Sequence, residues 1–127
     1  RFESRGLGDV YKRQLNVLTA QVLTFSDATG LDRDVALKVM AGTAAGRGHM
    51  STTYPSKVLK GELDPAFMID LAKKDLDIAI EFSKVLGVPI SLALQAEKIY
   101  TEAQEDGRGN QDWTAIFDML HKKQFLN

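Results

Sequence analysis

Apolar residues recur every three or four positions along most of this chain, and this spacing constrains the fold more than any other feature. One example is the series Leu15, Leu18, Val22 and Phe25, with intervals of three, four and three. Such a repeat follows the turn of an α-helix, whereas a half-buried strand needs alternation at every second residue. Because β-branched and aromatic residues fall on the same helical period, we expect an all-α fold of five or six helices.

Turn-forming residues divide the chain into helical segments. Glycine favours a helix C-terminus and aspartate an N-cap, so these residues predict where segments end and begin. The expected elements are a helix ending at Gly30, a second opening at Asp32, a loop over 42–48, a short helix over 56–60, a long helix over 69–86, and two further helices beyond Pro89 and Asp112. The residues expected to line the core are Leu15, Leu18, Val22, Phe25, Val35, Val39, Met40, Leu71, Leu76, Ile78, Ile80, Phe82, Val85, Leu92, Ala96, Ile99, Ala103, Trp113, Ile116, Phe117 and Leu120.

A resemblance to something other than a protein sets the first fourteen residues apart. Residues 4–14 read Ser-Arg-Gly-Leu-Gly-Asp-Val-Tyr-Lys-Arg-Gln, and this string resembles one translated frame of a transposase-type sequencing adaptor. We therefore expect residues 1–14 to be non-native and the native segment to cover 15–127. The alternative is that Lys12 and Arg13 belong to a native basic arm.

Charge and composition argue against three classes of protein: nucleic-acid binders, thiolate metalloproteins and membrane-spanning proteins. Beyond residue 14 the chain keeps twelve of its sixteen Lys and Arg but fifteen of its seventeen Asp and Glu, a net charge of about −3 that disfavours nucleic-acid binding. Without cysteine the chain has no disulfide and no thiolate metal site, which fits a reducing compartment such as the cytoplasm. No run of apolar residues is long enough to predict a membrane span.

Few residues have the spacing of a catalytic or metal site. The two histidines, His49 and His121, are far apart in the sequence. We expect His49 to be a neutral surface residue of the Gly-rich loop and His121 to be structural or solvated near a helix C-terminus, where the dipole favours a cation. Asp70, Asp75 and Asp77 share one expected helix, and a salt-bridged or solvated face is the simplest interpretation. We expect no metal ligand.

Lys74 is the candidate binding residue that this spacing singles out. It lies about one and a half turns into the helix over 69–86, from where its ammonium can reach a phosphate, ribose or carboxylate beyond the helix end. The alternative is a surface lysine paired with Asp70, four positions earlier. A second anion site, a nest of backbone amides at Gly46-Arg47-Gly48, rests on those three residues alone.

A set of short motifs gives the chain a family resemblance. The motifs are Pro65-Ala66-Phe67, Asp70-Leu71, Lys74-Asp75-Leu76, Leu86-Gly87-Val88-Pro89, Tyr100, Gly107-Arg108-Gly109 and Asp112-Trp113. Together they resemble the C-terminal domain of the β-hydroxyacid dehydrogenases, which include 3-hydroxyisobutyrate dehydrogenase, and the similarity covers 15–121. Within the family, the stretches 44–49, 54–55, 57–61 and 111–113 look nearest to the sulfolactaldehyde reductases.

The resemblance implies a two-domain enzyme that moves a hydride between NAD or NADP and a small 3-hydroxy acid or its semialdehyde. A Rossmann domain would precede this helical domain and hold the cofactor, and the parent would be a homo-oligomer. The family's catalytic lysine falls upstream of Leu15, so Lys12 is out of register and no substitute. This chain also has Gln21 where the family usually has Glu. By itself the chain should be inactive and should self-associate.

The resemblance carries over two cofactor contacts residue by residue. Lys74 matches a lysine that reaches the cofactor near its nicotinamide end, and Phe67 matches an aromatic position beside the same cofactor, with core packing as the alternative. Gly46, Arg47 and Gly48 match a loop that faces the interdomain cleft, without a defined role. No catalytic residue is expected within this chain.

Two other function classes compete with this one. A non-catalytic helical protein-interaction module is the main alternative, and an upstream strand–Gly-x-Gly-x-x-Gly–helix unit would decide against it. A helix-turn-helix DNA binder needs a basic recognition helix, whereas the helix over 69–86 has three lysines against four acids.

Overall fold

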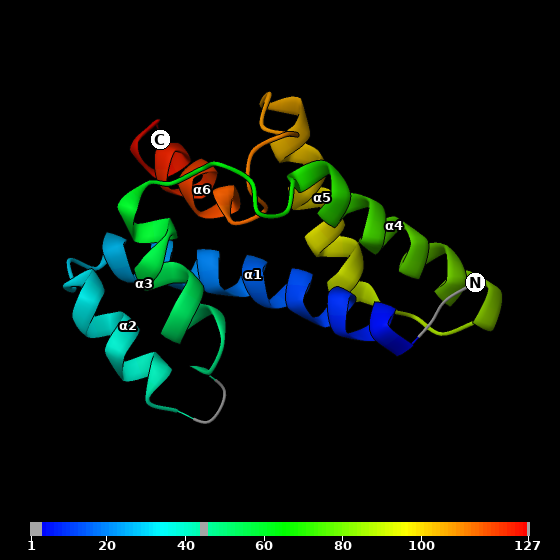
Figure 1. Cartoon of the computed structure of the whole chain (residues 1–127), viewed down its shortest axis with the longest axis horizontal. Coiled ribbons are helices and arrows are strands. Elements are labelled where there is room, and N and C mark those ends of the chain that lie inside the picture. Colours follow the sequence, from blue (N-terminus) through cyan, green and yellow to red (C-terminus); the bar gives the residue numbers. More distant parts are fainter. Residues whose placement is uncertain (1–3, 44–45, 127) are drawn as a thin grey trace.

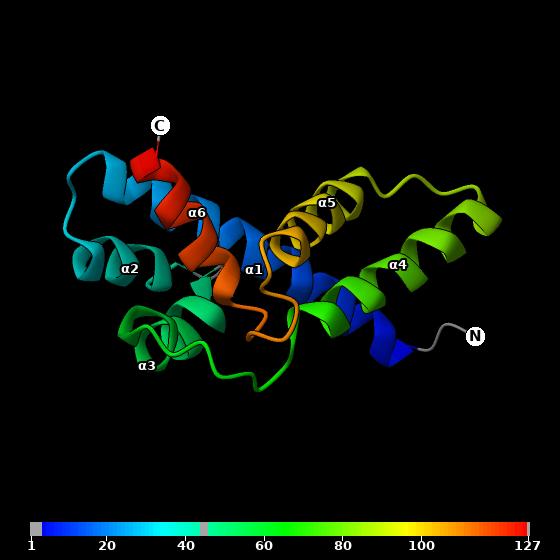
Figure 2. The same ribbon diagram turned by 90° about the horizontal axis from the view of Figure 1, so that it is seen from above.

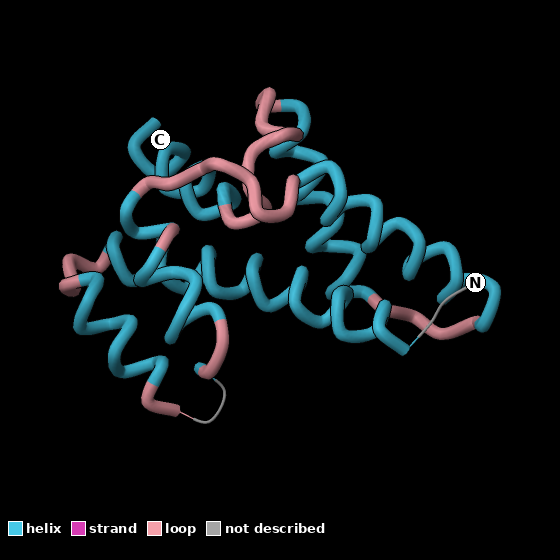
Figure 3. Tube along the Cα trace, in the orientation of Figure 1, coloured by secondary structure: helices cyan, strands magenta, loops and turns pink. Residues whose placement is uncertain are grey.

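The computed structural model describes residues 4–43 and 46–126, and across them it is helical apart from turns and one isolated β-bridge (Figures 1 and 3). Six α-helices confirm the expected all-α class, and two shorter helical turns accompany them. The elements are α1 (Ser4–Ala28), α2 (Arg33–Ala41), the π-helical turn η2 (His49–Thr53), α3 (Tyr54–Ser56), the 3-10 turn η3 (Val58–Lys60), α4 (Ile69–Leu86), α5 (Ser91–Glu105) and α6 (Ala115–Leu126).

Helix α1 is the central element of the fold. It contacts α2, η2, α4, α5 and α6, and the α4–α5 hairpin forms a further close pair. In Figures 1 and 2 the hairpin lies along the N-terminal half of α1, while α2, α3 and α6 gather around its C-terminal half. Residues distant in sequence therefore meet on the surface of one helix.

The ends of the helices follow the local signals. The Asp32 side chain accepts a hydrogen bond from the Val35 N–H at 3.1 Å, as expected of an N-cap. Gly87 ends α4 in the left-handed region, with φ at 70°, so the helix expected over 69–86 is confirmed at both ends. The short helix expected over 56–60 begins earlier, because α3 opens at Tyr54 and η3 continues the turn.

The small-residue loop over 42–48 is more closely packed than expected. A Cβ on Gly46 would lie 2.0 Å from the Met40 carbonyl oxygen, so only glycine fits where the chain folds back on α2. His49 opens η2 instead of lying in the loop. Residues 44–45 of the 44–49 motif, and the side chain of His49, lie outside what the structure describes.

The inward face expected for α1 is wrong at two of its four residues, Leu18 and Phe25, whereas Leu15 and Val22 are half-buried. Leu18 and Phe25 are 53% and 73% exposed, whereas Val17, Ala20 and Leu23 face the core. Polar residues share this buried face, and they are Arg13, Asn16, Thr19 and Ser26. Because these polar residues interrupt the apolar spacing on the buried face, the spacing of large apolar residues predicted a different face of α1 as the inward one.

On the other helices, too, some residues that were expected to be buried are exposed. In α4 the expected Leu76 and Ile80 are buried, but Leu71, Ile78, Phe82 and Val85 are exposed. Small residues do most of the inward packing of the α4–α5 hairpin, namely Ala72, Ala79, Ala93, Ala96 and Ala103. Further exposed residues that were expected inside are Val35, Val39 and Leu92, whereas Ile116 and Phe117 are buried as expected.

Candidate functional site

Phe67, the expected aromatic contact, lies in the loop directly before α4 and is fixed by the segment before α6. Its carbonyl accepts a hydrogen bond from the Trp113 N–H at 2.7 Å, and its own N–H donates to Asp112 Oδ1 at 3.1 Å. Next to it, Met68 and Asp112 form the isolated antiparallel bridge. The backbone of Phe67 therefore has a defined position without belonging to a helix or sheet.

Asp112 is the residue that fixes this loop, whereas the sequence marked it only as a helix start and as part of a family motif. Its carboxylate is 1% exposed and accepts from the backbone N–H groups of Ala66, Phe67 and Thr114, as well as from the Thr114 hydroxyl. The Lys57 ammonium lies 3.7 Å from Oδ1. A buried carboxylate with this many donors is well compensated for its loss of water.

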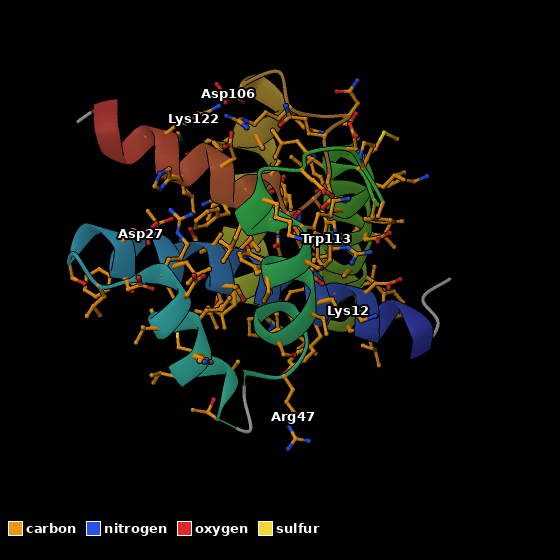
Figure 4. All side chains as sticks on the ribbon, turned by 60° about the vertical axis from the view of Figure 1, so that its left-hand side comes forward. Lys12, Asp27, Arg47, Asp106, Trp113 and Lys122 are labelled. Carbon is orange, nitrogen blue, oxygen red and sulfur yellow. The ribbon has the colours of Figure 1, made fainter. Side chains whose placement is uncertain are left out.

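Phe67 and Trp113 meet at a right angle and enclose a charged side chain. Their ring centroids are 6.4 Å apart with an interplanar angle of 84°. The guanidinium carbon of Arg13 lies 4.0 Å from the Phe67 centroid and 4.6 Å from that of Trp113, and Arg13 Nη2 donates to Asp75 Oδ2 at 3.1 Å. We name Phe67, Trp113 and Asp75 the aromatic corner. Figure 4 shows Trp113 in the middle of the molecule, close to the part of α1 that carries Lys12.

Lys73 and Lys74 are neighbours on α4 with opposite surroundings. Lys73 Nζ lies 2.6 Å from Asp77 Oδ2 and 3.4 Å from Glu97 Oε1, and the hydrogen bond to Asp77 raises the pKa of Lys73. Lys74 is exposed and forms no ion pair within residues 4–43 and 46–126. The pairing of Lys74 with Asp70 is not formed, because Asp70 Oδ1 accepts from Gln104 Nε2 at 2.7 Å.

A buried hydrogen-bond cluster beneath the aromatic corner was not foreseen. Asn16 Nδ2 donates to the Tyr100 hydroxyl at 3.0 Å and to the Trp113 carbonyl at 2.9 Å, while the Tyr54 hydroxyl donates to Asn16 Oδ1 at 3.1 Å. The Tyr100 hydroxyl donates in turn to the Arg13 carbonyl. Burial raises the pKa of both tyrosines, so they stay neutral and structural. A single Asn on a buried helix face is the sequence signal for such a cluster.

The other singled-out residues lie apart from this corner. Arg47 is exposed and extends away from the rest of the chain in Figure 4. The Gly48 N–H donates to the Ser51 hydroxyl, so that amide is not available to an anion nest. His121 stacks on Phe117 with ring centroids 5.8 Å apart, and its Nδ1 lies 3.5 Å from Asp27 Oδ2, as a structural role requires.

Two kinds of feature are absent from the described part of the chain, a metal-binding cluster and a membrane-spanning helix. No three His, Cys, Asp or Glu side chains of residues 4–43 and 46–126 gather closely enough to hold a metal ion. Among the helices of those residues, none combines the length and the apolar character needed to cross a bilayer.

Comparisons with known proteins place this geometry in context. Residues 15–120 match the family described as "NAD-binding of NADP-dependent 3-hydroxyisobutyrate dehydrogenase". The chain is 50% identical over 106 residues to 3-sulfolactaldehyde reductase of Escherichia coli (strain K12), covering 84% of this chain and 36% of that protein. L-threonate dehydrogenase of Haemophilus influenzae is 31% identical over 101 residues, with coverages of 80% and 33%.

A solved structure agrees on the fold. The crystal structure of 3-hydroxyisobutyrate dehydrogenase from Salmonella typhimurium matches with a TM-score of 0.81 at 23% identity, covering 91% of this chain and 40% of that one. At this identity the likeness shows the arrangement of helices alone. The chain thus spans 36% of the length of the first curated relative that it matches.

Proposed function

The chain belongs to the domain family described as "NAD-binding of NADP-dependent 3-hydroxyisobutyrate dehydrogenase", and from this premise we propose that it is the helical domain of a larger NAD(P)-dependent oxidoreductase. The parent enzyme transfers a hydride between NAD or NADP and a small 3-hydroxy acid or its semialdehyde. Support comes from two relatives at 50% and 31% identity, one a reductase and the other a dehydrogenase.

The proposal includes a division of the parent enzyme. A dinucleotide-binding domain and the catalytic lysine precede the matched region, and residues 1–14 are non-native. The start of the family match at residue 15 supports this division, and so does its coverage of 36% of the reductase. Lys12 is exposed on α1 and takes no part. We expect the chain alone to catalyse no reaction.

Within this domain, Lys74 and Phe67 contact the cofactor, whose nicotinamide ring supplies the hydride chemistry when bound. The observation that carries this assignment is the difference between the two adjacent lysines. Lys73 is held by Asp77 and Glu97, whereas the exposed Lys74 has no ion pair in the described parts of the chain. Its three N–H donors are therefore available to a phosphate, ribose or carboxamide oxygen.

The adjacent lysines also give the experiment its matched control. In the full-length parent, Lys74→Ala should raise the KM for the nicotinamide cofactor roughly tenfold to a hundredfold, as loss of a charge-assisted hydrogen bond does. Lys73→Ala removes the same charge one position away and should leave that KM within about twofold, because its partners lie within the domain. Equal effects of the two substitutions would remove Lys74 from the site.

The surface between α1 and α5 is suited to self-association. Exposed apolar residues of α1 and α5, among them Leu18 and Leu92, line a groove of about 270 Å³ that suits a second copy of the chain. We propose that the parent is a homo-oligomer that uses the part of this groove lined by residues beyond position 14, because Tyr11 and Gln14 on its wall belong to the segment proposed to be non-native. We place it in the cytoplasm, which a cysteine-free composition fits.

A further inference from the structure

The aromatic corner forms three walls of a recess around the side chain of Arg13. Its walls come from the loop before α4, from α4 itself and from the turn before α6. The two ring-bearing residues are tied by the 2.7 Å hydrogen bond from the Trp113 N–H to the Phe67 carbonyl. The third wall is the Asp75 carboxylate, whose side chain is 30% exposed. The Asp112 carboxylate holds the backbone of Phe67, so the two aromatic walls are tied together by contacts that do not involve Arg13.

Arg13 fills this recess, but its fit is incomplete. Its side chain is 6% exposed, and its guanidinium faces both rings and donates to Asp75. Its Nε is buried and has no hydrogen-bond partner among the described residues. A buried donor without an acceptor is destabilising, so the recess does not match every part of an arginine side chain.

The three wall residues lie within the region that matches the family, and Arg13 does not. Phe67, Asp75 and Trp113 all fall within the matched region 15–120, whereas Arg13 lies outside it. The walls therefore lie in the part of the chain that matches the family, and Arg13 lies in the segment proposed to be non-native. We propose that the aromatic corner is a binding site for small planar cations of the guanidinium type, and that Arg13 acts as its internal occupant.

The chemistry of the three walls determines this ligand class. Aromatic faces attract a cation through their quadrupole, and a flat cation brings its charge close to both rings. A carboxylate adds a charge-assisted hydrogen bond to a planar N–H donor. A neutral molecule of the same shape keeps the packing but loses both attractions. The site stands on this geometry alone and goes beyond the cofactor contact proposed for Phe67.

Removal of the occupant tests the proposal. In Arg13→Ala, methylguanidinium should change the fluorescence of Trp113, the only tryptophan in the sequence, in a saturable way. The midpoint should be at least about tenfold lower than in the unaltered chain, as one charge-assisted contact predicts. Urea, the neutral planar analogue, should give no saturable change, and the double variant Arg13→Ala with Asp75→Asn should lose the effect.

Arg33→Ala is the matched control, because Arg33 also stacks on a ring, that of Phe117 at 5.2 Å, and pairs with Asp27. It should not create a methylguanidinium site that Trp113 reports. Identical titrations for the unaltered chain and Arg13→Ala, with helical circular dichroism retained, would overturn the proposal.

A second measurement needs no variant and covers the case in which Arg13→Ala does not fold. In the unaltered chain, nuclear magnetic resonance should show the side-chain protons of Arg13 strongly shifted by the ring currents of Phe67 and Trp113. Its guanidinium should also rotate slowly. Random-coil shifts with fast rotation would equally overturn the proposal.

Discussion

The carboxylate of Asp112 binds the backbone N–H of Phe67 at 3.1 Å across 45 positions of sequence. The same oxygen accepts the N–H of Ala66 at 2.9 Å, so one buried charge orders the loop that leads into α4. The position of the proposed cofactor contact is thus set by a residue that precedes the last helix.

Substitution of this carboxylate should weaken the whole fold. Asp112→Asn keeps the volume and one acceptor oxygen, but its amide group would face the Thr114 N–H, a second donor. We expect the free energy of unfolding to fall by about 2–3 kcal/mol, the usual cost of a lost buried charge partner. Urea denaturation followed by circular dichroism measures it.

Asp106→Asn provides the comparison for that measurement. Asp106 pairs with Arg108 at 2.7 Å, but its side chain is 53% exposed. Water and salt screen such a pair, so its removal should cost less than about 1 kcal/mol. Equal losses for the two variants would show that the buried network around Asp112 has no special role.

Alkaline pH should destabilise the fold through Tyr54 and Tyr100. Burial raises the pKa of both above the ordinary value, whereas in the unfolded chain each ionises near about pH 10. Above that pH the unfolded state loses protons that the folded state keeps. The contribution of these two tyrosines to the free energy of unfolding should therefore be constant below about pH 9 and fall by about 3 kcal/mol by about pH 11.

A variant separates the two tyrosines. Tyr100→Phe removes one of the two titrating groups and should halve the pH-dependent loss relative to its own stability at neutral pH. Urea midpoints across this pH range, with tyrosine ionisation followed by ultraviolet absorbance, give both quantities. A stability that does not change up to about pH 11 would mean that the phenols ionise freely in the folded chain.

The groove between α1 and α5 should drive self-association. Leu18 and Leu92 lie along it and are 53% and 75% exposed, and burying one leucine contributes about 1.5–3 kcal/mol. Leu18→Lys should therefore weaken the dimer by at least about tenfold in sedimentation equilibrium. Val39→Lys, on the exposed side of α2, should have no such effect. A monomeric unaltered chain at high concentration would contradict the proposed interface.

The sequence predicts the helices of this fold better than their orientation. Gly87 and Asp32 are local signals, because a left-handed residue or an N-cap acts on its own turn. The buried face depends on what packs against a helix. Alanines such as Ala72 and Ala96 are buried where α4 and α5 pack together. A prediction based on the spacing of large apolar residues does not detect a buried face made of alanines.

Long-range polar contacts were beyond prediction for a related reason. The hydrogen bonds from Asn16 to Tyr100 and from Phe67 to Asp112 produce no periodic pattern in the sequence, because the partners lie tens of positions apart. Lys74 could be selected by its position and by family resemblance, and its cofactor role remains a prediction. Arg13 was set aside with the adaptor-like residues, although it lies at the centre of the described contacts.

The buried polar face of α1 also determines when this domain can fold during its synthesis. Asn16 needs Tyr100 and the Trp113 carbonyl, 84 and 97 positions further along. During synthesis α1 leaves the ribosome before Tyr100 and Trp113 have been made. Until then the side-chain amide of Asn16 has neither partner and is hydrated. We therefore expect this domain to fold only after α5 and the turn that carries Trp113 have been made.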